Sequence, residues 1–143
     1  MSFATESTTL RAPLIASWTL SDIRWPGTPY TPPPHTGNPT SPASWIDFLV
    51  DYPGTQPLTF SALARIDGVL DIGIFIEPGP RAEPVSRDYI DALEAIYAPN
   101  AVDSSTLFFR PFEARADPVG LDTDAGGSEW WLTRWVLPFW RIE

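Results

Sequence analysis

Apolar and polar residues alternate along several segments of this chain, and such alternation predicts half-buried β-strands. The clearest example is the segment 69–77, V-L-D-I-G-I-F-I-E, in which every second residue is a large aliphatic one. Its apolar face holds Leu70, Ile72, Ile74 and Ile76. The segments 44–51, 58–64 and 105–113 show the same period, and we expect a turn at residues 52–54.

The segment 128–142 differs from these strands because both of its faces are apolar. It holds four of the seven tryptophans, with Trp131 and Trp135 on one face and Trp130 and Trp140 on the other. An antiparallel strand next to water normally has one polar face. We therefore expect one face to pack on a helix and the other to be covered by a neighbouring subunit or by the N-terminal segment. Pro138 cannot donate to a ladder, which predicts a sheet edge, or the end of the sheet, at that residue.

Helical spacing of apolar residues appears twice. Val85, Tyr89 and Leu93 form one stripe and predict a helix over 84–97, which Pro99 ends. A weaker stripe within 4–20 predicts a second helix, kinked or started by Pro13.

Two long segments lack both periods. The segment 25–43 contains seven prolines and predicts an extended loop, either a surface connector or an arm that reaches another subunit. The segment 114–127 is polar and predicts an acidic hairpin loop before the last strand.

The order of these elements predicts the fold class. We expect one domain, 1–143, of the α+β class, with a mainly antiparallel twisted sheet of about four to five strands and one or two helices packed on one face.

Composition narrows the chemistry further. The chain has no cysteine and no lysine, which excludes thiol catalysis, zinc–thiolate sites and Schiff-base chemistry. The single histidine, His35, lies in the proline-rich loop. A flexible loop positions a catalytic base less precisely than a helix or strand does. Asp122 and Asp124 faintly resemble the start of a calcium loop, but we interpret them as a solvated acidic turn. We expect no enzyme activity and no cofactor or metal.

Charge and hydropathy bear on possible partners. The net charge of −9 disfavours binding to phosphate backbones. The apolar runs are far shorter than the roughly 20 residues of a membrane span, so we expect no membrane partner.

An ordered series of residues resembles the tail terminator, or tail completion, proteins of long-tailed phages and related gene transfer particles. The series covers nearly the whole chain from Leu10. The matching residues are Trp25-Pro26-Gly27, Tyr30, Pro32-Pro33, Trp45 to Val50, Arg65, Gly68, Leu70, Ile72, Phe75, Pro78, Gly79, the helix 84–97, Gly127, Trp130, Trp131, Val136, Pro138 and Phe139.

The resemblance implies a structural virion protein of the tail and neck, assembled in the host cytoplasm. Such proteins form a homohexameric ring at the head-proximal end of the tail tube, stop tube growth and join the tail to the neck. The implied partners are further copies of the chain, the tail tube protein and the head–tail connector or stopper protein. Genomic DNA would pass through the lumen without specific binding.

Three alternatives remain open from the residues alone. One is another ring-forming neck or tube protein, such as a head-completion stopper or the tube subunit itself. The others are a small hydrolase that uses aspartates and a carbohydrate-binding module that uses the tryptophans. For a ring-forming subunit, the candidate residues at the subunit or tube interface are Tyr30, Pro33, His35, Asp117, Asp122, Asp124, Trp130 and Trp135.

Overall fold

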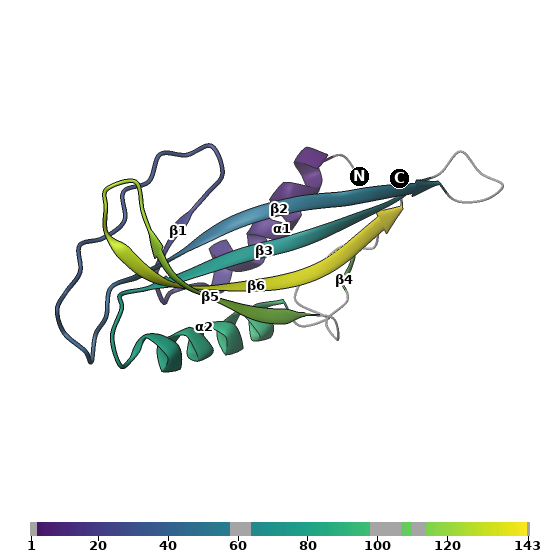
Figure 1. The fold of residues 1–143 in the computed structure, drawn as a ribbon. Coiled ribbons are helices and arrows are strands. Elements are labelled where there is room, and N and C mark those ends of the chain that lie inside the picture. Colours follow the sequence, from purple (N-terminus) through teal and green to yellow (C-terminus); the bar gives the residue numbers. More distant parts are fainter. Residues whose placement is uncertain (1–2, 58–63, 98–106, 110–113, 143) are drawn as a thin grey trace.

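The computed structural model of this chain describes residues 3–57, 64–97, 107–109 and 114–142 (Figure 1). In chain order the elements are α1 (Phe3–Ser17), β1 (Asp22–Arg24), β2 (Ser44–Pro57), β3 (Ala64–Ile76), α2 (Ala82–Ile96), β4 (Leu107–Phe109), β5 (Arg115–Thr123) and β6 (Glu129–Ile142).

The six strands form one mixed sheet in the order β1-β2-β3-β6-β4, with β5 also paired to β6. Only the pairing of β1 with β2 is parallel, and all other described pairings are antiparallel. Both β5 and β4 lie along the same edge of β6, one after the other. The α+β prediction, with a mainly antiparallel sheet and two helices, is confirmed.

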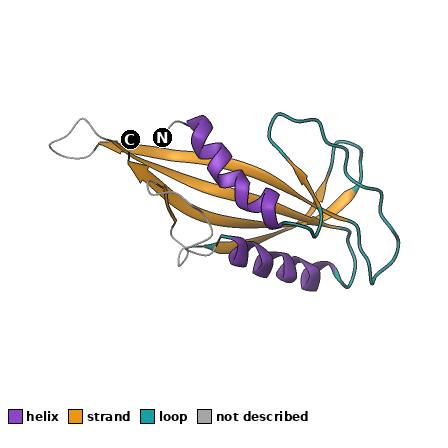
Figure 2. Cartoon of the chain, turned by 180° about the vertical axis from the view of Figure 1, so that it is seen from behind, coloured by secondary structure: helices purple, strands orange, loops and turns teal. Residues whose placement is uncertain are grey.

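Both helices cover the same face of the sheet, as the view from behind shows (Figure 2). We call it the helix face. Tyr89 and Leu93 of α2 pack there with Leu10 and Leu14 of α1, and Tyr97 lies 5.8 Å from Trp135 between ring centroids. The aliphatic face predicted for β3 points into this core, as does one face of β6. The predicted packing of that face on the second helix is therefore confirmed.

Helix α1 runs through Pro13 and continues for one further turn, so the proline neither starts nor ends it. Leu10 and Leu14 are fully buried on its inner side, as their spacing predicts. Burial of this stripe offsets the missing hydrogen bond at Pro13. In the part of the chain that the structure describes, no helix is long and apolar enough to cross a membrane.

Two sequence predictions about loops are wrong. The turn expected at residues 52–54 is a bulge between Asp51 and Gly54, and β2 continues to Pro57. The predicted acidic hairpin loop is mostly strand β5, whose side chains are nearly all exposed. Of the strand predicted at 105–113 only Leu107–Phe109 is described, and the strand predicted at 58–64 falls outside the described residues except for Ala64.

The prediction for Pro138 is only partly right. The distal end of β6 stays inside the sheet, between β3 and β4. Pro138 itself pairs with Val69 of β3. On the other side, the described pairings of β5 reach Val136 and those of β4 begin at Phe139, so Pro138 lies between them. A residue without an N–H group therefore sits where β6 changes partner.

Candidate functional site on the outer sheet face

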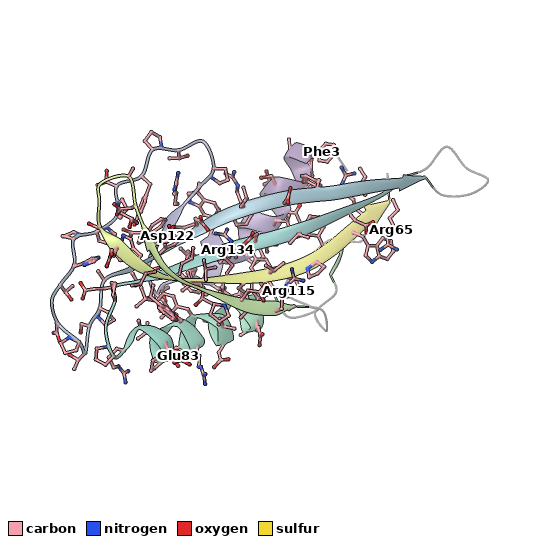
Figure 3. The ribbon with its side chains drawn as sticks, viewed as in Figure 1. Phe3, Arg65, Glu83, Arg115, Asp122 and Arg134 are labelled. Carbon is pink, nitrogen blue, oxygen red and sulfur yellow. The ribbon has the colours of Figure 1, made fainter. Side chains whose placement is uncertain are left out.

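The face opposite the helices, which we call the outer face, carries most of the residues predicted to meet a partner. The sheet register arranges them in rows across β2, β3 and β6. We call the end of the sheet that holds the β5–β6 turn the hairpin end. From this end toward the chain termini, the rows are Trp45–Phe75–Leu132, Asp47–Gly73–Arg134, Leu49–Asp71–Val136 and Asp51–Val69–Pro138. Figure 3 looks onto this face, with Asp122 and Arg134 toward one end and Arg65 toward the other.

The first row belongs to an aromatic cluster that is buried without any helix. The rings of Trp45 and Phe75 stack at 3.8 Å with an interplanar angle of 3°, and Trp130 meets Trp45 edge-on at 6.1 Å. Tyr30 covers Trp45 from the proline-rich loop at 5.3 Å, and His35 contacts Trp130 edge-on at 4.7 Å. The outer aromatic cluster thus consists of Tyr30, Trp45, Phe75 and Trp130, and the chain's own loop forms its roof.

The proline-rich loop is held in place by Glu77, at the end of β3. The Glu77 carboxylate accepts hydrogen bonds from the backbone N–H of Thr36 and from its hydroxyl, the latter at 3.2 Å. Glu77 is buried, so this carboxylate is satisfied by the loop rather than by bulk water. The loop is therefore an ordered roof over the outer aromatic cluster, and Tyr30 reaches the cluster from it.

On the opposite side of the cluster, Asp124 shapes the turn between β5 and β6. Its carboxylate accepts hydrogen bonds from the backbone N–H groups of Gly126 and Ser128 at 2.9 and 3.0 Å. It also accepts the indole N–H of Trp130 at 2.9 Å. These hydrogen bonds, that of the Trp130 indole foremost, hold the pKa of Asp124 below its ordinary value. The turn and the aromatic cluster are therefore tied through one side chain.

In the second row Arg134 lies between two carboxylates. Its Nε donates to Asp71 at 2.8 Å, and its Nη2 lies 3.5 Å from Asp47. Asp47 also accepts the backbone N–H of Gly73 at 2.7 Å, a close approach that a side chain at Gly73 would block. Burial raises the pKa of Asp47, and the charge of Arg134 only partly opposes this rise.

Between the loop roof and the β5–β6 turn lies an open groove of about 770 Å³. Arg24, Tyr30 and Pro32 line one wall, and Asp122 and Asp124 line the other. Its floor mixes the aromatic cluster with the Arg134 group, so charges of both signs meet at the groove. No set of three or more His, Cys, Asp or Glu side chains that could hold a metal ion occurs within the described ranges.

The structure divides the predicted interface residues into three groups. The first group lies in the proline-rich loop and the β5–β6 hairpin, and its side chains are partly or fully exposed to a partner: Tyr30, Pro33, His35, Asp122 and Asp124. Asp117 is exposed on β5 and pairs with Arg115 at 3.0 Å.

Trp130 and Trp135 do not belong to the candidate surface, which corrects the prediction. Their exposed fractions are 0% and 1%, and they lie in different cores on opposite faces of the sheet. Successive side chains of β6 point to opposite faces of the sheet. Trp135 is therefore buried against the helices, and Trp130 is buried in the outer aromatic cluster. The interface therefore cannot use these two rings without rearrangement of the subunit.

The cover on the outer face is incomplete. Toward the chain termini, Leu49 is 45% exposed, while Val69, Pro138 and Trp140 are half-buried. Arg65 lies over the ring of Trp140, with its guanidinium carbon 4.8 Å from the ring centroid. The expectation that a neighbour or the N-terminal segment covers this face is thus wrong for the hairpin end, where the proline-rich loop does so.

Comparison with known proteins gives a fold and no family. No family model matches the chain, and no curated protein matches it. A solved structure whose name states no function has the same fold, with a TM-score of 0.58 and 14% identity. The match covers 96% of this chain and 95% of the other. The whole α+β architecture therefore recurs in another protein.

Proposed function

We propose that this chain is a structural virion subunit that resembles the tail terminator of long-tailed phages. Copies of it would form a homohexameric ring at the head-proximal end of the tail tube, stop tube growth and join the tail to the neck. The ring would contact the tail tube protein on one side and the connector or stopper protein on the other.

One observation carries this proposal. The residues of the resemblance are scattered along the sequence, yet Tyr30, Trp45, Phe75 and Trp130 among them meet in the outer aromatic cluster. Arg65, Gly68, Leu70 and Ile72 belong to β3. Residues from distant parts of a chain that share one cluster support a shared architecture better than separate short motifs do.

Charge is consistent with a ring that lets DNA pass. Six copies would carry six times the net charge of −9, and the acidic side chains Asp117 and Asp122 are exposed beside the hairpin. Where acids line a lumen, DNA phosphates are repelled rather than bound.

Two of the tryptophans that a carbohydrate-binding module would use are inaccessible. Sugar stacking needs an accessible aromatic face, whereas Trp45 is 3% exposed and Trp130 is fully covered. A stopper or tube subunit remains the main competitor, because it would also be a ring-forming domain.

The test uses the purified chain and the tail tube protein from the same genome, viewed by negative-stain electron microscopy. We expect the chain alone to form rings and no tubes, and to shorten the tubes that the tube protein forms, with extra density at one end. Long tubes from the chain alone would identify a tube subunit. Tubes of unchanged length at saturating chain would reject the terminator function.

A further inference from the structure

The sheet has two free edges on opposite sides, and each carries exposed apolar residues. On one side, among the residues that the structure describes, β1 covers β2 only at Trp45–Asp47. On the other side β5 pairs with β6 along one edge and has no strand along its second edge in the described part of the chain. Of the seven large apolar residues that are exposed in that part, four lie on these edge strands: Leu49 (45%) and Tyr52 (37%) on β2, and Val119 (56%) and Leu121 (60%) on β5.

We infer that the free edge of β5 in one copy pairs with the free edge of β2 in the next, so that copies join head to tail through one continuous sheet. The inference rests on the proposed function, because it specifies how the copies of a ring would meet. A strand edge presents a row of N–H and C=O groups that another strand edge can satisfy. Two different edges on opposite sides make the contact heterologous, which is the kind that closes into rings.

Strand direction fits this contact. The pairs β2–β3, β3–β6 and β6–β5 are all antiparallel, so β2 and β5 run in opposite directions. Rotation about an axis that runs broadly along the strands preserves the direction of every strand in the next copy. The β5 strand of one copy and the β2 strand of the next would then be antiparallel, which continues the alternation within each subunit.

Prolines and bulges limit where such pairing can occur. In β2 a bulge follows Asp51, and Pro53 has no N–H to donate. In β5 Pro118 precedes a bulge that ends at Gly120. The regular stretches that lack a strand partner on the free edge and carry an exposed apolar side chain are Phe48–Asp51, with Leu49, and Gly120–Thr123, with Leu121. Prolines and bulges commonly prevent a strand edge from pairing with unrelated strands. Because they leave only two short stretches here, they restrict the register of the contact to a few residues.

The contact requires neighbouring copies to be staggered along the strands. In the sheet register Arg115 of β5 is level with Val136, Asp71 and Leu49, so the rest of β5 lies level with the part of β2 that precedes Leu49. Pairing Gly120–Thr123 with Phe48–Asp51 therefore shifts one copy by several residues. A closed ring accepts such a shift only if its strands are tilted to its axis, as the strands of barrels are by roughly 35–45°.

The test uses two edge variants and a matched control. Leu121→Glu alters the β5 edge, Leu49→Glu alters the β2 edge, and Ile15→Glu alters the most exposed apolar residue of α1, at 69%. Circular dichroism and urea unfolding establish that each variant is folded, and Val119→Glu serves as a second β5 variant. Sedimentation velocity gives the size of each species.

We expect the wild type and Ile15→Glu to assemble alike, and each edge variant to need about tenfold or more protein for assembly, because it buries an unpaired charge. An equimolar mixture of Leu121→Glu and Leu49→Glu retains one intact pair of edges and should give dimers but nothing larger. Hydrogen exchange should slow at residues 48–51 and 120–123 on assembly.

A wild type that stays monomeric, an edge variant that assembles normally, or a mixture without dimers would overturn the inference. Tube capping separates this result from the proposed function. If Leu121→Glu still caps tubes, the edge contact is rejected while the terminator function stands. If the edges assemble the wild type but tubes grow unchanged, the terminator function is rejected while the contact stands.

Discussion

Glu6 and Arg141 lie 2.5 Å apart in the interior of the protein, and both side chains are fully buried. This ion pair joins the first helix to the last strand. The Tyr52 hydroxyl also donates to Glu6, and the guanidinium carbon of Arg141 lies 4.7 Å from the ring centroid of Phe3. Three parts of the chain, namely α1, β2 and β6, thus meet at one buried charged group.

Removal of one partner of this pair should be strongly destabilising. We expect Glu6→Leu to lower the free energy of unfolding by about 3–5 kcal/mol, because Arg141 would keep its charge in a buried place without this carboxylate. The double variant Glu6→Leu/Arg141→Met should recover most of that loss, since neither charge of the pair remains. Urea unfolding followed by circular dichroism measures both.

The exposed pair between Glu83 and Arg87 provides the control. The two side chains lie 2.6 Å apart and are 64% and 74% exposed, so Glu83→Ala should cost no more than about 1 kcal/mol. If Glu6→Leu and Glu83→Ala prove equally mild, the interior pair does not stabilise the fold as described.

Gly68 of β3 lies directly beneath the ring of Phe139, so that a Cβ atom there would overlap the ring. We expect Gly68→Ala to destabilise the protein by about 1–3 kcal/mol, the usual range for overpacking a core. Gly126→Ala is the control, because its Cβ would meet only Asp124, at 3.3 Å. Comparable thermal midpoints for the two variants would show that the contact at Phe139 relaxes freely.

The turn held by Asp124 should weaken in acid. Because the folded-state pKa of this carboxyl is lowered, its contribution to stability is present above the ordinary pKa of 3.8 and is lost as the pH falls through the lower folded value. Asp124→Ala should therefore lower stability at neutral pH and flatten the loss on acidification. Urea unfolding at several pH values, with exposed Asp122→Asn as a control, gives the comparison. An Asp124→Ala variant with an unchanged acid response would contradict this role.

Tyr30 should contribute to loss of stability in alkali. Burial and the nearby charge of Asp22 raise the pKa of Tyr30 to about 12 from an ordinary 10.0. The neutral phenol is thus favoured in the folded state, and its contribution is present below about pH 10 and is lost between that pH and about 12. Tyr30→Phe should remove this share of the alkaline decline while the remaining buried tyrosines keep theirs. Tyrosinate absorbance should show one fewer late-ionising group, and an unchanged titration would contradict the assignment.

The elements with one buried face could be predicted from the sequence because burial leaves a periodic pattern. Leu10 and Leu14 in α1, and Ile72 and Ile74 in β3, are fully buried where their spacing places them. Strand β5 has no such face, since its side chains are nearly all exposed. It is held to β6 by backbone hydrogen bonds, which do not require particular residue types. It therefore resembled a loop.

The candidate site was harder to predict because its contacts join residues far apart in the chain. Alternation places Asp47, Asp71 and Arg134 on one face of their strands, but only the register brings them together. Likewise, nothing local to Tyr30 indicates that it covers Trp45. The roof forms because Glu77 anchors the loop, a contact across 41 residues of sequence.

The strand β6 has a consequence for how the sequence can change. Its two faces are buried in separate cores, and Pro138 stands where one neighbouring strand gives way to another. Insertion or deletion of a single residue before Pro138 would exchange the two faces and misplace that boundary at once. In β5, by contrast, a bulge already accommodates an extra residue. Length variation should therefore be tolerated in β5 and excluded from β6, although the two strands are hydrogen-bonded to each other.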